Sequence, residues 1–434
     1  MMVSYHHKNS GQFEDICVAD LDYAFTNVTL PDREGRWCVG VAEGKIVEIV
    51  EGDRLNAQHV WHLDGKLLTP GLVDAHTHID KAFTAESLGD VFAQSGLASA
   101  IQAVRHLKSQ FTIADIKQRA TQALQWSIAA GTTAIRTNVE ADAFVELRAV
   151  EGLLDVQRSL SDQIDIQLVA FPQEGWFAIP ETLESGASTY VEQALQHGIK
   201  VIGGNVNQGL WSSNPEAQVD ALFDLALRYN CDLDLHLDNW DSAEAFTLPY
   251  VAQKTIEHHY QGRVAVSHIA SLIHVSDSQA QVAIELLKQA EISVTVLPTR
   301  IKLTRVAELL EAGLNVVCGT DNLRDPFIRY GDADLLKALF LLAQLTGYMA
   351  NRDLERLWQT ISNNAAKMLR LPYGINVGNL ADLVVFDAYS IPEAILHQAT
   401  RLAVFKSGKL VAGTMQDQVL SLHKPDFMSP RRWT

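Results

Sequence analysis

Histidine and aspartate residues that could share a metal ion stand at four points along the chain. The first is the pair His76 and His78, which are separated by one residue. Because neighbouring side chains of a strand point to opposite faces, both imidazoles would project to the same side and could hold one ion. A single His-x-His pair is weak evidence by itself, since histidines also occur in ordinary cores. A metal site is therefore indicated only if further candidate ligands occur elsewhere in the sequence.

Three later apolar runs also end in residues that bind metals, at His236, His268 and Asp321. Taken alone, His236 could be a core histidine and Asp321 could be a helix N-cap. Packing does not explain why four such runs end in ligand-competent residues. His268 is the less secure ligand and the better unbound neighbour of the metal, because a catalytic site leaves one position open for water.

The elements that position these residues alternate between two types. From about Leu68 to Leu371, short apolar runs alternate with longer segments of helical periodicity. The eight candidate strands are Gly71–His76, Thr133–Val139, Ile164–Phe171, Lys200–Asn205, Asp232–Leu237, Arg263–Ile269, Ile292–Leu297 and Leu314–Gly319. Eight strand-helix repeats predict an α/β protein with a (β/α)₈ barrel, although a doubly wound open sheet has a similar periodicity. The carboxyl ends of barrel strands meet at one mouth, so the polar strand ends favour the barrel.

The two ends of the chain are predicted to form a small β-sandwich domain together, from residues 1–68 and 376–434, with the barrel at 69–375. Runs rich in β-branched residues occur at Trp37–Glu43, Lys45–Val50, Val60–Leu63, Ala381–Asp387 and Leu402–Val411. Gly44-Lys45 and Gly408-Lys409 each lie between two such runs and are typical of tight hairpin turns.

Composition restricts the partners. The 434 residues include 35 basic and 52 acidic side chains, a formal net charge of −17, which disfavours binding to nucleic acid or to anionic membranes. The start of the sequence does not have the pattern of a signal peptide, and no run of about 18 apolar residues occurs. We therefore expect a cytoplasmic protein. The scattered cysteines suggest buried thiols and no disulfide framework.

Longer motifs around these residues resemble one known family. The order His-x-His, His, His and Asp is similar to that of the amidohydrolase superfamily. The segments Pro70 to Lys81, Ile135 to Val139, Val169 to Gly175 and Asp321 to Pro326 resemble its cytosine deaminase branch. The His-x-His-x-Asp-Lys form and the Asp321-Asn322 pair resemble the N-isopropylammelide isopropylaminohydrolases within that branch. The similarity extends from the first barrel strand through the closing β domain.

The resemblance implies roles for individual residues. His76, His78, His236 and Asp321 would hold one divalent ion, zinc or iron, and His268 would hydrogen-bond the water on that ion. Gln173 would bind the ring of a heterocyclic substrate, and Asn322 would lie on the substrate side. Relatives of this kind are commonly homo-oligomers.

One departure from the cytosine deaminase pattern changes the expected proton transfer. Those enzymes carry a glutamate three residues after the histidine of strand five, where this chain has Asn239. An amide cannot carry a proton between water and a ring nitrogen, so cytosine is a doubtful substrate. Lys81 then becomes the better candidate for protonating the leaving nitrogen, with Asp321 as the alternative. Asn138, where Arg-Thr-His is usual in that branch, also indicates an altered pocket.

These observations predict a metal-dependent aminohydrolase that releases ammonia or an amine from a nitrogen heterocycle, such as an aminopyrimidine or an alkylamino-s-triazine. Asp321, His268 and Lys81 are the predicted catalytic residues. Gln173, Asn239, Asn322 and Trp240 are the predicted substrate-binding residues, Trp240 by stacking on the ring. Two alternatives are hydrolysis of a non-aromatic cyclic C–N bond at the same metal site, and a non-catalytic metal- or ligand-binding protein on the same scaffold.

Overall fold

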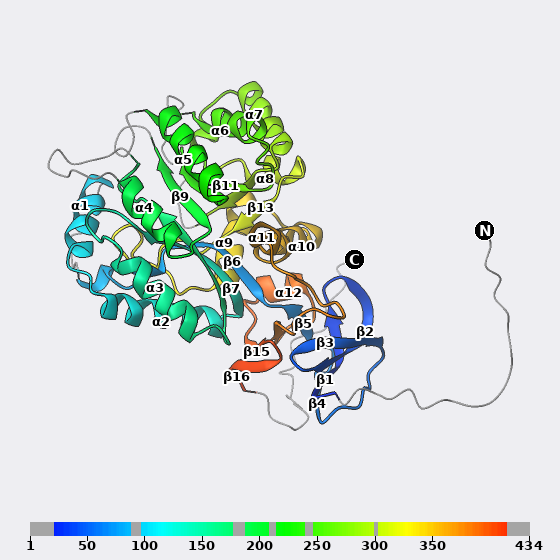
Figure 1. Ribbon diagram of the computed structural model, residues 1–434. Helices are drawn as coiled ribbons and strands as arrows, with labels where there is room; N and C mark the ends of the chain where they lie inside the picture. Colours follow the sequence, from blue (N-terminus) through cyan, green and yellow to red (C-terminus); the bar gives the residue numbers. More distant parts are fainter. Residues whose placement is uncertain are drawn as a thin grey trace, which may run out of the picture.

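The protein consists of a parallel barrel and a second, mixed sheet built from both ends of the chain (Figure 1). The computed structural model describes residues 21–87, 97–176, 187–207, 214–238, 246–298 and 303–414. Within these residues no helix is both long enough and apolar enough to span a bilayer.

Eight parallel strands form the barrel in chain order. They are β6 (Leu72–Thr77), β7 (Thr132–Glu140), β8 (Asp165–Phe171), β9 (Val201–Val206), β10 (Asp232–Leu237), β11 (Val264–His268), β12 (Ser293–Val296) and β13 (Val316–Cys318). Every residue of β6, β7, β9, β12 and β13 is buried, as expected for parallel strands covered by helices on one face and packed side chains on the other. The predicted barrel is confirmed.

The barrel closes between its first and last strands. Thr77 and Asp321 form a parallel bridge, and the Asp321 amide donates to the carbonyl oxygen of His76 at 2.9 Å. A β-carbon on Gly319 would lie 2.6 Å from that same carbonyl oxygen, so only glycine permits this approach. The closure brings the end of β13 directly against His76.

Helices surround the barrel (Figure 1). The α-helices are α1 (Leu97–Lys108), α2 (Ile113–Ala129), α3 (Arg148–Ser159), α4 (Ala187–Gln196), α5 (Pro215–Tyr229), α6 (Leu248–Glu257), α7 (Asp277–Gln289), α8 (Val306–Glu311), α9 (Leu335–Thr346), α10 (Asn351–Trp358), α11 (Asn363–Leu369) and α12 (Ile391–Leu396). Short 3₁₀ helices are η1 (Ile79–Lys81), η3 (Ala270–Ile273) and η4 (Gln359–Ile361). Helix α2 begins with a capping box in which Thr112 and Asp115 bond each other's backbone amides.

The second sheet joins the two ends of the chain, as predicted. Its strands are β1 (Tyr23–Leu30), β2 (Arg33–Ala42), β3 (Lys45–Glu51), β4 (His59–His62), β5 (Leu67–Pro70), β14 (Leu383–Phe386), β15 (Arg401–Lys406) and β16 (Lys409–Gly413). They run in the order β16-β15-β14-β5-β1-β2-β3, with β4 also beside β1. The predicted hairpins at Gly44 and Gly408 are present between β2 and β3 and between β15 and β16. Sequence analysis missed β1 and β5, and the predicted domain boundaries remain a prediction.

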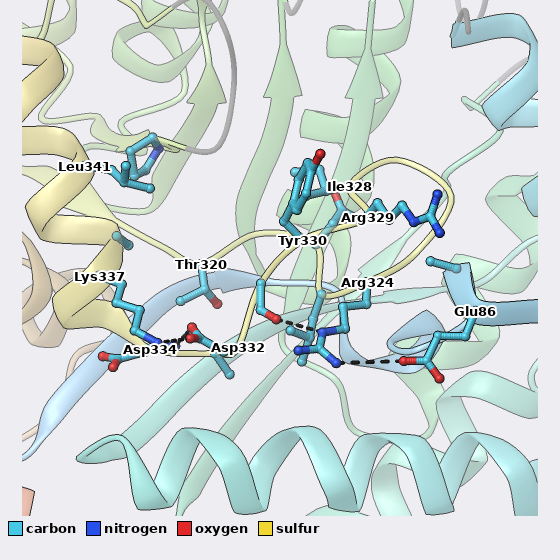
Figure 2. Close-up of a pocket in the computed structure, with 17 residues that line it drawn as sticks. Glu86, Thr320, Arg324, Ile328, Arg329, Tyr330, Asp332, Asp334, Lys337 and Leu341 are labelled. Atoms are coloured by element: carbon cyan, nitrogen blue, oxygen red, sulfur yellow. Dashed lines mark hydrogen bonds and ion pairs between the residues drawn. The ribbon is translucent and has the colours of Figure 1, made fainter. Parts of the chain in front are cut away.

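A cavity of about 780 Å³ lies beside the loop that follows β13 (Figure 2). Its lining includes Thr320 and Asn322, the neighbours of Asp321, together with Arg324, Tyr330 and Leu341 of α9. As far as the structure describes it, the lining contains no histidine. This hollow therefore borders the chain on both sides of Asp321.

Candidate metal centre

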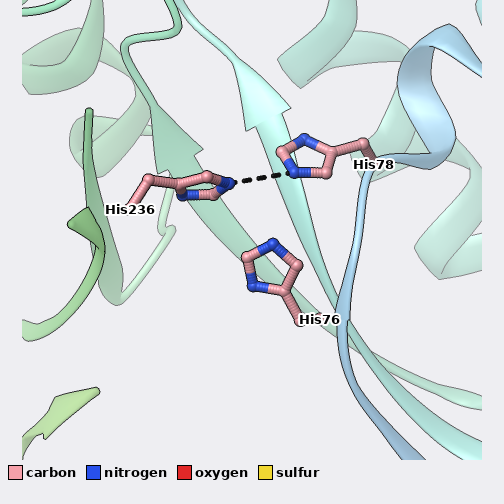
Figure 3. Close-up of side chains that lie close together, drawn as sticks. All are labelled: His76, His78 and His236. Atoms are coloured by element: carbon pink, nitrogen blue, oxygen red, sulfur yellow. Dashed lines mark hydrogen bonds between the residues drawn. The ribbon is translucent and has the colours of Figure 1, made fainter. Parts of the chain in front are cut away.

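Three histidines from two strand ends converge inside the barrel mouth (Figure 3). His76 lies in β6, His78 follows that strand, and His236 lies in β10. Each offers a ring nitrogen, and these three nitrogens lie within 4.8 Å of one another. The Nε2 atoms of His78 and His236 are 3.1 Å apart. Residues 158 positions apart in the sequence therefore share one small volume.

Asp321 completes the cluster. Its Oδ1 lies 3.7 Å from Nε2 of His76 and 3.6 Å from Nε2 of His78. Four donors bonded to one ion at 2.0 to 2.1 Å in tetrahedral geometry would be about 3.4 Å apart. The three separations between His78 and His236, Asp321 and His76, and Asp321 and His78, at 3.1 to 3.7 Å, lie on either side of that value. The three histidines form a group that could hold a metal ion, and Asp321 lies beside two of them.

The protonation state of His78 also suits a metal ligand. Its side chain is 3% exposed. Burial, and then the positive charge of Lys81, lower the pKa of His78 well below its ordinary value. The ring is therefore neutral, which is the form that binds metals.

His268 lies at the edge of the cluster. Its ring centroid is 5.0 Å from that of His236 and 5.8 Å from that of His76. His268 and Asp321 both have positive φ, at 73° and 61°. Such conformations are uncommon outside glycine and persist where the surroundings impose them, often at functional sites.

Asp74 holds the backbone of the loop that carries Asp321. It is fully buried and accepts hydrogen bonds from the hydroxyl of Thr320 at 2.6 Å and from the Thr320 amide at 3.1 Å. Sequence analysis placed Asp74 inside the motif but gave it no role. Its contacts show that it fixes the residue next to Asp321.

Lys81 contacts the outer edge of the cluster. Its Nζ lies 3.2 Å from Nδ1 of His78, whereas Nε2 of the same ring faces His236. The ammonium also donates to Glu140 Oε1 at 2.8 Å. Burial lowers the pKa of Lys81, but the negative charges of Glu140 and Asp80 outweigh this and raise the pKa above its ordinary value.

The predicted substrate-binding residues fall in different surroundings. Gln173 is 7% exposed and lies in the turn after β8. Asn322 is 4% exposed, and its amide donates to Asp325 Oδ2 at 2.6 Å. Trp176, an aromatic residue in the turn after β8, is buried at 6% exposure. Asn239 and Trp240 lie outside the described residues.

Sequence analysis missed a group of buried charges behind Lys81. Glu140 ends β7, Lys108 ends α1, and Glu174 follows Gln173. All three are at most 3% exposed. Lysines and glutamates are seldom fully buried, so nothing in their residue types distinguishes them from solvated surface charges. The one available signal was the place of Glu174 inside the Phe171 to Gly175 motif.

Comparison with known proteins gives a consistent result. The amidohydrolase family matches residues 60–412. The chain is 33% identical to an N-isopropylammelide isopropyl amidohydrolase of Pseudomonas sp. (strain ADP), over 92% of this chain and 99% of that protein. It is 27% identical to a pterin deaminase of Rhizobium rhizogenes (strain K84 / ATCC BAA-868), over 90% of this chain and 91% of that protein.

A solved structure has a similar fold. It is that of 5-methylcytosine deaminase from Klebsiella pneumoniae, liganded with 5-fluorocytosine. Its TM-score is 0.83 at 26% identity, covering 93% of this chain and 99% of that one.

Proposed function

The chain belongs to the amidohydrolase family and is a hydrolase of C–N bonds, and from this premise we propose that it is a metal-dependent aminohydrolase of nitrogen heterocycles. The observation that carries the proposal is the convergence of His76, His78 and His236, with the Asp321 carboxylate 3.6 to 3.7 Å from two of them. Three imidazoles and one carboxylate are a ligand set for a single divalent ion, which we propose to be zinc or iron. Such an ion supplies a nucleophilic water at neutral pH.

The side chains around these donors suggest a division of work. Asp321 is proposed to accept a proton from the attacking water and to return it to the leaving nitrogen. His268 is proposed to hydrogen-bond the attacking water and to hold its oxygen as it bonds to the ring carbon. Gln173 is proposed to bind the ring nitrogens. The product is the hydroxy or oxo form of the ring, with ammonia or an amine released.

The role of Lys81 follows from where its ammonium lies. Protonation of the leaving group by Lys81 stays a prediction, and the 3.2 Å contact with the outer nitrogen of His78 favours Asp321 for that step. In the described conformation Lys81 instead places a positive charge behind a ligand. We propose that this charge, together with burial, keeps His78 neutral.

The substrate class rests on the relatives. Proteins similar to this chain are named for N-isopropylammelide, pterin and 5-methylcytosine, which are all nitrogen heterocycles. We propose an aminopyrimidine or an alkylamino-s-triazine as the substrate. Asn239 disfavours cytosine itself, because an amide cannot replace the proton-carrying glutamate of cytosine deaminases. We further propose that the protein is a cytoplasmic homo-oligomer.

Metal content and amine release test the proposal together. Purified wild-type protein should hold about one divalent ion per chain and should release ammonia or isopropylamine from a panel of N-isopropylammelide, 5-methylcytosine and pterin. His236→Ala should lose both the ion and the activity. His197→Ala, which removes an exposed histidine, is the control and should keep both. Absence of metal from the wild type would overturn the proposal.

Adding a saturated cyclic amide to the panel separates the two alternatives. Hydrolysis of a saturated cyclic amide, with no amine released from any aromatic ring, would show a cyclic amidase. Metal binding without turnover of either kind of compound would show a binding protein on an enzyme scaffold.

A further inference from the structure

Three carboxylates converge on one buried ammonium outside the metal centre. Lys108 Nζ lies 2.6 Å from Asp142 Oδ2, 2.7 Å from Glu174 Oε1 and 2.9 Å from Glu140 Oε2. The side chains of all four residues are between 1 and 5% exposed. We call Lys108, Glu140, Asp142 and Glu174 the Lys108 cluster.

The Lys108 cluster joins three connections of the barrel. Lys108 is the last residue of α1, Glu140 is the last residue of β7, and Glu174 lies in the turn after β8. Each belongs to a segment at or beyond the carboxyl end of a strand, where barrel enzymes place their sites. Glu140 also accepts from Lys81 at 2.8 Å, so the cluster reaches the residue that contacts His78.

The turn that carries Gln173 is held from two sides. Asn205, in β9, donates its side-chain amide to the carbonyl oxygen of Gln173 at 2.8 Å. On the other side Glu174 is bound by Lys108 at 2.7 Å and by Arg105 at 2.6 Å. The turn itself is closed by a hydrogen bond from the Gly175 amide to the Pro172 carbonyl at 2.9 Å. Gln173 is therefore anchored through its own carbonyl group and through the side chain of the next residue, Glu174.

We propose that Lys108 and Glu174 are positioning residues, which fix the turn carrying Gln173 relative to the metal ligands and so set how the substrate ring is held. The proposal rests on the function proposed above, in which Gln173 binds the ring. A buried ion pair is a costly way to stabilise a fold, because desolvation offsets the attraction between the charges, and apolar side chains often serve as well. It does impose a strict geometry on the segments it joins. Misplacing a binding group by about 1 Å can cost up to about a hundredfold in rate.

Glu174→Gln tests this with little change of shape. The amide keeps the volume of the carboxylate, and Lys108 retains Glu140 and Asp142. We expect KM for the best substrate of the panel to rise about tenfold, with kcat within about twofold and metal content unchanged. Asp142→Asn removes a carboxylate at an equally short contact with Lys108 but outside the turn, so KM should rise less than in Glu174→Gln.

Hydrogen exchange gives a second readout that does not depend on turnover. The Gly175 amide should exchange faster in Glu174→Gln than in wild type, and less so in Asp142→Asn. Lys108→Met should show both effects if it folds. The double variant Lys108→Met with Glu174→Gln should raise KM no further than the larger single change, because the ion pair between Lys108 and Glu174 is already broken in each single variant.

The outcomes separate this inference from the proposed function. If wild-type protein holds no metal and turns over no substrate, the proposed function is overturned. In that case, faster hydrogen exchange of the Gly175 amide in Glu174→Gln than in wild type or Asp142→Asn still supports the positioning of the turn by Glu174. Equal KM values and equal exchange in wild type, Glu174→Gln and Asp142→Asn overturn the positioning, whatever the substrate. An equal rise of KM in both variants also overturns it, because that result indicates general loss of structure.

Discussion

Around the candidate metal centre, each neighbouring charge controls the protonation of the next. Lys81 contributes to the low pKa of His78, and Glu140 contributes to the raised pKa of Lys81. Burial raises the pKa of Glu140, but Lys108 and Lys81 outweigh this and hold it at about 2. These ionised neighbours therefore add to burial, which is the larger cause, in keeping His78 neutral.

The pKa of Glu140 makes stability depend on pH in a defined direction. Its folded-state pKa of about 2 lies below the ordinary value of 4.5, so its contribution is present above pH 4.5 and is lost as the pH falls toward 2. Between pH 6 and pH 3.5, Glu140→Gln should lose about 1 kcal/mol less free energy of unfolding than wild type. Urea titrations at both pH values measure this, with the exposed Glu146→Gln as control. If wild type and Glu140→Gln lose the same free energy of unfolding between pH 6 and pH 3.5, the prediction is wrong.

Among the barrel strands, β7 is unusual because it is completely buried and yet has a mostly polar sequence. All nine residues of Thr132–Glu140 are buried, although most of them are polar. Arg136 accounts for part of this. Its guanidinium donates to Asp234 of β10 at 2.9 Å and to Gln167 of β8 at 2.7 Å. Polar side chains can fill the inside of the barrel here because they are bonded to one another.

Breaking this interior pair should destabilise the barrel. Arg136→Met leaves Asp234 as an uncompensated buried charge, and we expect a loss of about 3 to 5 kcal/mol in the free energy of unfolding. Arg158→Met breaks an ion pair whose arginine is 67% exposed, and it should cost no more than about 1 kcal/mol. Chemical denaturation of both variants measures the two losses in free energy of unfolding. If the two losses are similar, the interior pair does not hold the barrel together.

For the whole molecule, contacts between the second sheet and the barrel lie away from the metal centre. Lys406 of β15 places its ammonium 2.6 Å from Asp165, the first residue of β8, and 2.6 Å from Asp382. Tyr373 donates its hydroxyl to the carbonyl of Gly71, just before β6, at 2.8 Å. These contacts gather at the amino ends of the barrel strands, which serve stability in this architecture rather than catalysis.

Lys406→Met should therefore lower stability without touching the site. The lysine side chain is 3% exposed and both of its partners are partly exposed, so we expect a loss of about 2 kcal/mol. Metal content and kcat should equal those of wild type. Lys409→Met, at an exposed position of the same hairpin, is the control for thermal unfolding. Loss of metal in Lys406→Met would show that the second sheet supports the metal centre after all.

The sequence by itself determined the strands of the barrel and the residues at their ends. All eight strands lie within two residues of their predicted bounds at either end, because apolar runs of strand length and the helical periodicity between them are local patterns. The candidate ligands could be chosen before the fold was known, since parallel strands of one barrel bring their carboxyl ends together.

Tertiary structure alone decided what depends on residues distant in the sequence. The approach of β13 to β6 at Gly319, the pairing of β5 with β14, and the burial of Lys108 among three carboxylates join segments from 32 to more than 200 residues apart. No local pattern encodes them. A buried lysine or glutamate has the same residue type as a solvated one, and only the partners that the fold brings to it set its burial and its pKa.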